Sequence, residues 1–184
     1  NLKNIKLSNV TNVKVDAPSF ELVKEYTGSY YRDKDNIFYY DMNKKELKKV
    51  EGSDRNSFVE MDNFFAKDNK NVYEIYTTDD EKIKIRAIKN LNIDVASFEN
   101  IFKEAFYKDK NSVYYVDMTE DKQELKKLEG ADADTFELGI FSKDKNSVYV
   151  DKQRLEGVSP KGFEILDNDL EFIKRSAQHT SALQ

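Results

Sequence analysis

One short string occurs four times along this chain, and its recurrence constrains the fold more than any other feature. Three copies have the form Lys-Asp, three polar residues, then Val-Tyr, and the first copy reads Arg-Asp-Lys-Asp-Asn-Ile-Phe. The copies occupy residues 32–38, 67–73, 108–114 and 143–149. Two further strings recur in step: a Phe anchor at positions 20, 58, 98, 136 and 163, and Glu-Leu-Lys-Lys-x-Glu-Gly at residues 46–52 and 124–130. Three anchors recurring in the same order predict a chain of similar tandem units.

Each unit combines a turn with strands, as its third copy illustrates. Asp and Asn side chains bond to nearby backbone groups, so residues 109–112 are predicted to form a hairpin turn. Residues 113–116 are β-branched and aromatic, with apolar side chains on both faces, which predicts a strand with neighbours on each side. We expect a third strand over residues 124–128 and a helical turn before the next Phe. The predicted fold is therefore mainly β, with three-stranded antiparallel meanders, each a β-hairpin plus a third strand, joined by short helical turns.

The units cover about residues 19–56, 57–96, 97–134 and 135–161, within a single repeat domain of residues 1–175. Residues 1–18 are interpreted as the end of a preceding unit. Residues 162–175 are amphipathic and are expected to form a short C-terminal helical cap, and residues 176–184 to be a disordered tail or a cloning remnant. One meander buries too little surface to be stable alone, so neighbouring units should share a core. Four units are few for a closed ring, which favours an open array.

Composition removes several classes of protein and site. The chain has no cysteine, which excludes a disulfide scaffold, a thiolate metal site and a cysteine nucleophile. No apolar run reaches the roughly 18 residues that a membrane-spanning helix needs, so no membrane span is expected. The net charge of −5 favours solubility over disorder. Because the sequence starts at Asn1 rather than Met, a signal peptide would lie upstream of it.

The residues that could carry catalysis or bind a metal form no convincing motif. The only histidine, His179, lies in the polar tail, where no packed neighbourhood holds an imidazole for a catalytic triad or a metal site. Residues 33–36 begin like a calcium loop, but Ile37 and Phe38 follow where a glycine turn should come. The similar pairs Asp132 with Asp134, and Asp167 with Asp169, are interpreted as turn caps. No Gly-rich phosphate loop occurs. The sequence therefore predicts no catalytic residue, no metal ligand and no cofactor, and the chain is expected not to be an enzyme.

Three lysine pairs suggest either a basic stripe for a nucleic acid or protection of strand edges. They are Lys44-Lys45, Lys48-Lys49 and Lys126-Lys127. The sequence pI is about 5.1, and acidic residues are interleaved with the lysines, which is a poor footprint for nucleic acid. Exposed strand lysines protect sheet edges from aggregation. We therefore expect no nucleic-acid partner.

Two tyrosines are the candidate binding residues. Neighbouring residues on a strand point to opposite faces, so Tyr39 lies opposite Phe38, and Tyr115 opposite Tyr114. If Phe38 and its counterparts Tyr73, Tyr114 and Tyr149 face the shared core, Tyr39 and Tyr115 face the other side of their sheets. Aromatic side chains on such a face are typical of protein-binding surfaces. The alternative is that both rings simply cover the second face of a sheet.

The motifs also resemble those of a known family. The string Lys-Asp-Lys-Asn-x-Val-Tyr-Tyr at residues 108–115, followed by Glu-Gly-Ala-Asp-x-x-Thr-Phe at residues 129–136, resembles the DKNYY family of bacterial repeat proteins. The resemblance covers about residues 19–166. It implies a bacterial source and a repeat-built β architecture, and it supplies no activity and no catalytic residues.

These observations lead to one functional expectation and two alternatives. The leading expectation is a non-enzymatic bacterial interaction module that binds another protein, for example as an inhibitor or immunity-type protein, because repeats build extended faces. The first alternative is an exported cell-envelope structural or adhesive protein, and the second, least favoured, is a hydrolase. The sequence leaves the compartment open, with the cell envelope or the extracellular space slightly favoured over the cytoplasm.

Overall fold

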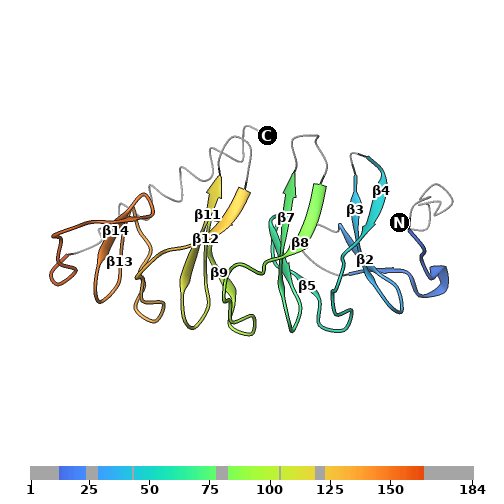
Figure 1. Ribbon diagram of the computed structural model, residues 1–184, viewed down its shortest axis with the longest axis horizontal. Coiled ribbons are helices and arrows are strands. Elements are labelled where there is room, and N and C mark those ends of the chain that lie inside the picture. The colour runs from blue at the N-terminus through green and yellow to red at the C-terminus, as the bar shows by residue number, and fades with distance from the viewer. Residues whose placement is uncertain are drawn as a thin grey trace. The chain divides into compact units, whose positions relative to one another are not determined.

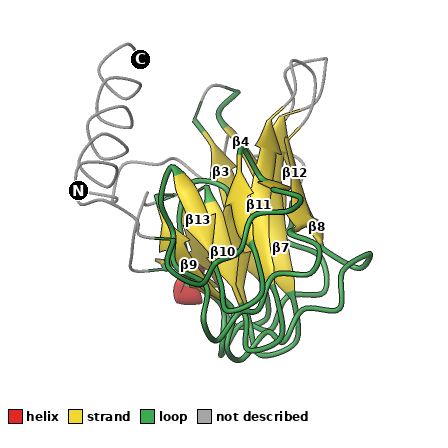
Figure 2. Cartoon of the chain, turned by 90° about the vertical axis from the view of Figure 1, so that its left-hand side faces the viewer, coloured by secondary structure: helices red, strands yellow, loops and turns green. Residues whose placement is uncertain are grey.

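β-Strands dominate the structure (Figure 2). This computed structural model describes residues 13–23, 29–42, 44–77, 83–103, 105–118 and 123–163, and all structural statements below refer to them. The only helix among these residues is the 3-10 helix η3, Ala17–Ser19. No helix in this part of the chain is long and apolar enough to cross a membrane. The prediction of a mainly β fold is confirmed.

The strands form four antiparallel sheets, each a meander of consecutive strands (Figure 1). Sheet 1 contains β1 Glu21–Leu22, β2 Tyr30–Arg32, β3 Ile37–Asp41 and β4 Glu46–Lys49. Sheet 2 contains β5 Val59–Glu60, β6 Phe65–Lys67, β7 Val72–Thr77 and β8 Ile83–Ala87. Sheet 3 contains β9 Glu99–Phe102, β10 Phe106–Lys108, β11 Val113–Met118 and β12 Gln123–Lys127. Sheet 4 contains β13 Phe141–Lys143, β14 Val148–Val150 and β15 Gln153–Arg154.

Three of the sheets have four strands, so the predicted three-stranded meander was wrong by one strand. The additional strand is the first one of each sheet: β1, β5 or β9. In sheet 3, β9 and β10 both precede the turn at Asp109. The chain bends between them near Lys103, where φ is 31° and the Ala105 N–H donates to the Phe102 carbonyl at 2.8 Å. Sheet 4 keeps only an isolated bridge between Glu137 and Lys143 at the corresponding place. β1 and β5 have two residues each, which is too few to show an alternating pattern in a sequence.

The predicted helical connectors are mostly tight turns. Residues 55–57, 95–97 and 133–135 are turns, and only Ala17–Ser19 satisfies the geometry of a helix, with Pro18 at its start. A fixed φ near −65° suits the first turn of a helix, which accounts for this difference. The predicted C-terminal cap and the polar tail lie outside the described residues, apart from a turn at residues 161–162.

The chain divides into two compact units. Unit 1 is formed by Asn1–Val95 with Thr119–Gln123, and unit 2 by Ala96–Met118 with Glu124–Gln184. Among the described residues, unit 1 contains sheets 1 and 2, while sheet 4 and nearly all of sheet 3 belong to unit 2.

The main core of unit 1 lies between its two sheets. Ile37 and Tyr30 of sheet 1 pack with Tyr73, Ala66 and Ile75 of sheet 2, and all five side chains are buried. The opposite face of sheet 1 is packed as well, because Phe38, Tyr31 and Leu47 form a second buried cluster covered by Val13, Val15 and Phe20. Sheet 1 therefore has apolar contacts on both faces, as expected for a strand with apolar side chains on both sides.

The core of unit 2 is smaller. Val113 and Leu128 of sheet 3 pack with Tyr149 of sheet 4 and with Ala133 from the segment that joins the two sheets. Partly buried Phe106 and Phe136 line the same cluster, with their ring centroids 6.4 Å apart. The two sheets of unit 2 thus share apolar side chains as the sheets of unit 1 do.

Candidate functional site

The recurring string forms one hairpin turn in each sheet, between the second and third strands of sheets 1 to 3 and between the first two strands of sheet 4. Its Asp is buried in all four copies, at Asp33, Asp68, Asp109 and Asp144. One carboxylate oxygen accepts two N–H groups of the following turn at 2.7–2.8 Å. The Asp N–H closes the turn by donating at 3.0 Å to the carbonyl of the residue three positions later. This is the Asx-turn geometry that the sequence predicted.

The Tyr that ends the string completes the same network. The hydroxyls of Tyr73, Tyr114 and Tyr149 donate to the second carboxylate oxygen of their own Asp at 2.7–2.9 Å. Burial and the neighbouring carboxylate raise the pKa of Tyr73 well above its usual value. The first copy has Phe38 at this position, so Asp33 lacks this partner. The side chains that define the string are therefore used to hold its turn together.

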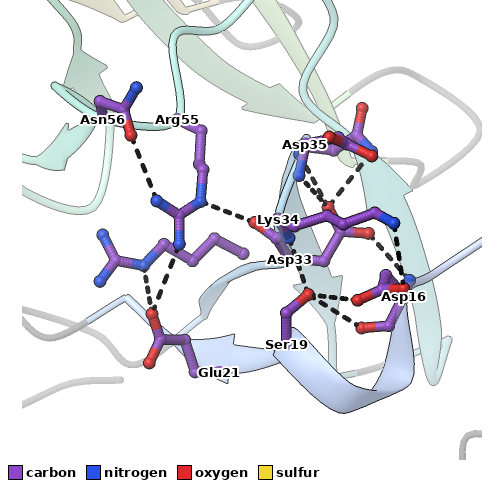
Figure 3. A network of polar contacts seen from close by, with 10 residues as sticks. Asp16, Ser19, Glu21, Asp33, Lys34, Asp35, Arg55 and Asn56 are labelled. Atoms are coloured by element: carbon purple, nitrogen blue, oxygen red, sulfur yellow. Dashed lines mark hydrogen bonds and ion pairs between the residues drawn. The ribbon is translucent and has the colours of Figure 1, made fainter.

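A second set of hydrogen bonds joins each turn to the segment preceding its sheet, which we call the connector (residues 16–20, 54–58, 94–98 and 132–136). The N–H groups of Asp16, Asp54 and Asp132 donate to the carboxylates of Asp33, Asp68 and Asp144 at 2.8–3.0 Å. In addition, the residue that follows each turn Asp donates its N–H to a connector hydroxyl at 2.8–3.1 Å. The accepting hydroxyls belong to Ser19, Ser57, Ser97 and Thr135. Figure 3 shows this arrangement at Asp16, Ser19 and Asp33.

One arginine links the two sheets of unit 1 at the same edge. The Arg55 Nε donates to the Asp33 carbonyl at 2.8 Å, and its Nη1 donates to the side chain of Asn56 at 3.2 Å (Figure 3). Glu21 lies 3.9 Å from the Arg55 guanidinium and 2.7 Å from that of Arg32. The connector of sheet 2 is thereby tied to the turn of sheet 1.

These contacts give the turn carboxylates a structural role. Burial, which raises the pKa of Asp33 and Asp68, is the largest single influence on each, but the N–H groups that donate to them outweigh it and lower both pKa values. The oxygens of Asp33 that resembled a calcium loop accept from the backbone at residues 16, 35 and 36. Asp132 accepts from Thr135 and pairs with Lys145 at 2.7 Å. No group of three or more metal-ligating side chains gathers among the described residues.

Tyr39, the first candidate binding residue, packs in unit 1. Its ring is partly buried against the core between the two sheets, 5.3 Å from the ring of Tyr30 in an edge-on contact. Ile83, Ile85 and Ala87 of β8 pack against the same core. Burial is the main cause that raises the pKa of Tyr39. The side of sheet 1 that the sequence assigned to a possible partner is therefore a packed face.

Tyr115, the second candidate, packs in unit 2. Its ring is partly buried against the cluster of Val113 and Tyr149, and the Lys152 ammonium lies 5.2 Å from the ring centroid. Lys152 also donates to the Val116 carbonyl at 3.1 Å. The two tyrosines lie in different units, each beside the core of its own unit.

In two of the three lysine pairs, the first lysine forms an ion pair and the second is exposed. Lys48 donates to the carboxylate of Asp41 at 3.1 Å, and Lys126 donates to Asp117 in the same way. Lys49 and Lys127 are exposed. Sequence reasoning missed both ion pairs, although a signal was present: the first and third repeats both combine Asp-Met at the end of one strand with Lys-Lys in the next. His179, Asp167 and Asp169 lie outside the described residues.

Sequence reasoning also missed a buried acid in sheet 2. Glu74, which occupies the position equivalent to Tyr39, is buried and binds the guanidinium of Arg86 at 2.8 Å. Arg86 also lies over the ring of Tyr76, with 4.6 Å between its Cζ and the ring centroid.

Comparison with known proteins agrees with the motif. A search of curated proteins and a search of solved structures each found no match. A family model matches residues 30–179, which include all four copies of the string. The matched span also contains the turn carboxylates and tyrosines described above. The chain belongs to the DKNYY family.

Proposed function

We propose that this protein is a non-enzymatic module that binds another protein. The observation that supports the proposal is that the recurring Asp and Tyr side chains of the string bind to their own turns. In each of the four turns the Asp carboxylate binds backbone N–H groups, and in three of them it also accepts a Tyr hydroxyl. A general acid, base or nucleophile needs a group directed at a substrate, whereas these groups are directed at their own turn.

The same turns are well suited to recognition. Each turn is fixed by several hydrogen bonds and carries two exposed side chains at its tip: Lys34 and Asp35, Asn69 and Lys70, Lys110 and Asn111, Lys145 and Asn146. Side chains on a rigid backbone lose less conformational entropy on binding than side chains on a mobile loop. A constant turn with variable tips is therefore a suitable scaffold for a binding surface.

We also propose that the four sheets are successive repeats of a bacterial tandem array, which is open rather than closed into a ring. Two observations support this reading. Each sheet has one copy of the string in one hairpin, between the second and third strands of sheets 1 to 3 and between the first two strands of sheet 4, where the Glu137–Lys143 bridge takes the place of a first strand. Within each unit the two consecutive sheets share one apolar cluster. Nearest-neighbour packing of this kind is how repeat arrays become stable.

Affinity capture tests the proposed function. The full chain, tagged and immobilised, is incubated with separate cytosolic and envelope fractions of the source organism, and retained proteins are displaced with untagged chain. A single protein recovered in stoichiometric amount, displaced by the untagged chain and binding the purified chain in calorimetry, is the expected result. Recovery of cell-wall material alone would contradict the proposal and support an envelope structural role. Substrate turnover by the purified chain would contradict its non-enzymatic part.

A further inference from the structure

Unit 1 shows how a sheet of this protein covers the aromatic face of the preceding sheet. The hairpin of β7 and β8 is long, with five register pairs from Tyr73–Ala87 to Thr77–Ile83. Its aliphatic side chains Ile83 and Ile85 pack against the core beside Tyr39. The Ile83 carbonyl accepts a hydrogen bond from the Lys48 ammonium at 2.9 Å. An aliphatic strand with a carbonyl directed at a lysine thus completes this face.

In unit 2 the equivalent strand, β15, is much shorter. The hairpin of β14 and β15 has only two register pairs, Tyr149–Arg154 and Val150–Gln153. It closes through Asp151 and Lys152, whose φ angles of 46° and 66° suit a tight two-residue turn. These two residues take the positions that Ile75 and Ile85 occupy in unit 1, as the registers of the two hairpins show.

The shorter hairpin changes the exposure of otherwise equivalent residues. The Asp41 side chain in unit 1 is 1% exposed and its partner Lys48 is 27% exposed. Their counterparts Asp117 and Lys126 in unit 2 are 29% and 44% exposed. Lys48 donates to both a carboxylate and a carbonyl. Among the described residues, Lys126 donates to the Asp117 carboxylate. An ammonium has three donor hydrogens, so Lys126 has the capacity for a carbonyl like the one that Lys48 binds.

We propose that the face formed by Tyr115, Asp117 and Lys126 docks an extended segment of a partner protein. The segment has aliphatic side chains at alternate positions, which cover Tyr115, and a backbone carbonyl that accepts a hydrogen bond from Lys126. β8 of unit 1, with the pattern Ile-Lys-Ile-Arg-Ala, is the internal example of such a segment. This inference rests on the proposed protein-binding function and names the surface and the kind of partner.

Physical considerations favour an extended aliphatic segment over a helix or a polyanion. Side chains on one face of a strand repeat at every second residue, which matches the spacing of Tyr115 and Asp117 along β11. The charges of Lys126 and Lys152 on this face are offset by Asp117 and Glu124, so a polyanion gains little there. Recognition of an extended segment through alternate side chains and main-chain carbonyls is a common mode of peptide binding.

A labelled peptide with the sequence of residues 82–89 tests the proposal against the full chain. We expect saturable binding in fluorescence anisotropy, with amide shifts in NMR spectra confined to β11, β12 and the Asp151–Lys152 turn. A control peptide with Asn at both positions 83 and 85 keeps the same charge and should bind at least about tenfold more weakly, a loss of about 1.4 kcal/mol. Equal binding of the two peptides would overturn the proposal, because attraction would then come from charge alone.

A hairpin graft provides the matched variant. Replacing residues 150–153 with the sequence of residues 74–86 gives sheet 4 the long hairpin of sheet 2. The graft should abolish peptide binding, whereas the same graft with Asn in place of both its Ile83 and Ile85 equivalents should leave most of it. Circular dichroism and melting confirm folding of both grafts. Unchanged binding by the aliphatic graft would overturn the proposal.

The other occupants of this face give different results. If the peptide binds only after Leu166→Asp and Leu170→Asp, the chain's own C-terminal residues cover the face and the proposal is wrong. If the chain is a dimer in light scattering and the aliphatic graft makes it monomeric, a second copy is the occupant and the proposal is again wrong.

Repeating the capture experiment with the aliphatic graft separates this inference from the proposed function. Loss of a partner that the unmodified chain retains is the expected result. Retention of that partner by the graft would overturn the docking face and leave the binding function standing. Failure of the unmodified chain to retain any partner would overturn the function itself, whatever the peptide does.

Discussion

Both units contain two consecutive antiparallel sheets with the same Asp-based turn. They differ in how the second sheet covers the aromatic face of the first. In unit 1, β8 places Ile83 and Ile85 beside the core that Tyr39 also lines, and the Asp41–Lys48 ion pair is largely buried. In unit 2 the equivalent Tyr115 is covered by the Lys152 ammonium, and Asp117 and Lys126 stay partly in water. The length of one hairpin therefore decides whether equivalent residues act as core or as surface.

Shortening the hairpin of unit 1 should have the largest effect. Replacing residues 75–85 with Asp-Lys, the turn of sheet 4, removes three isoleucines from the core and the carbonyl partner of Lys48. Burying one aliphatic side chain contributes about 1.5–3 kcal/mol, so we expect the free energy of unfolding of unit 1 to fall by about 4 kcal/mol. Urea unfolding followed by hydrogen exchange of β3 and β4 measures this loss. A change below about 1 kcal/mol, within the range of ordinary surface substitutions, would show that the hairpin is not a cover.

Equivalent tyrosine substitutions test the comparison directly. Tyr39→Ser should destabilise the protein by about 3 kcal/mol, because it leaves a cavity under β8. Tyr115→Ser should cost about 1 kcal/mol, since a ring covered by one lysine leaves less packing to lose. Thermal melting of both variants gives the difference. Equal losses would mean that both rings are core residues, and Tyr115 would then be removed from the docking face.

Only the structure shows that the length of one hairpin decides whether the aromatic face of the preceding sheet is covered. Local signals predicted the Asp-based turns and the strands that follow them, because these depend on residues within a few positions of one another. The long alternating run that contains Ile83 and Ile85 was visible in the sequence. Its contact with the core beside Tyr39 was not, since that contact depends on how two sheets pack. The same limit applied to the expectation that Tyr39 lies on a free face.

The turn carboxylates should make unit 1 sensitive to acid. The pKa of Asp68 is lowered from 3.8 because hydrogen bonds from N–H groups and from Tyr73 outweigh the effect of burial. Its contribution to stability is therefore complete above the pKa of the unfolded chain and is lost as pH falls through the lower folded-state pKa. Asp68→Asn should lower the free energy of unfolding at neutral pH by about 2 kcal/mol. It should also flatten the loss of stability below about pH 4.

Urea titrations of the unmodified chain and of Asp68→Asn at several pH values measure this effect. Asp33→Asn is the matched variant, because Asp33 has a lowered pKa as well but no Tyr hydroxyl. An unchanged pH profile in both variants would contradict the role given to these carboxylates.

The tyrosine hydroxyls should differ moderately between the units. Tyr73 contacts Asp68 at 2.7 Å and the Gly52 carbonyl at 3.2 Å, whereas Tyr149 contacts Asp144 at 2.9 Å. A net hydrogen bond to a charged group contributes about 1.5–3 kcal/mol, so we expect Tyr73→Phe to cost about 2 kcal/mol and Tyr149→Phe somewhat less. Phe38→Tyr adds a hydroxyl near Asp33 and serves as the converse variant. A larger loss for Tyr149→Phe would reverse the ranking of the two networks.

Lys152→Ala should have the smallest effect. The ammonium contacts the Tyr115 ring and the Val116 carbonyl at an exposed site, where a cation–π contact contributes about 0.5–1 kcal/mol. We expect a loss of about 0.5 kcal/mol in urea unfolding and faster iodination of Tyr115, whose ring becomes more accessible. Lys127→Ala, an exposed lysine in the same unit, is the control and should change neither quantity. Protection of Tyr115 that is unaffected by the substitution would mean that another group covers it.

The pairing of each connector with the turn that follows it has a consequence for how such a gene can change. The Asp54 N–H donates to the Asp68 carboxylate, and the Ser57 hydroxyl accepts the Asn69 N–H, so both bonds lie within one stretch of chain that begins at the connector. A duplication or deletion whose boundaries fall just before two connectors carries every one of these bonds intact. The contacts between neighbouring sheets must be matched anew, and in unit 1 these are mostly apolar, with Arg55 and Lys48 adding hydrogen bonds to carbonyls of the other sheet. Apolar surfaces tolerate substitution better than polar networks do. The chain can therefore gain or lose whole sheets, and the length of a single hairpin can then make the newly placed sheet a cover or leave the face before it open.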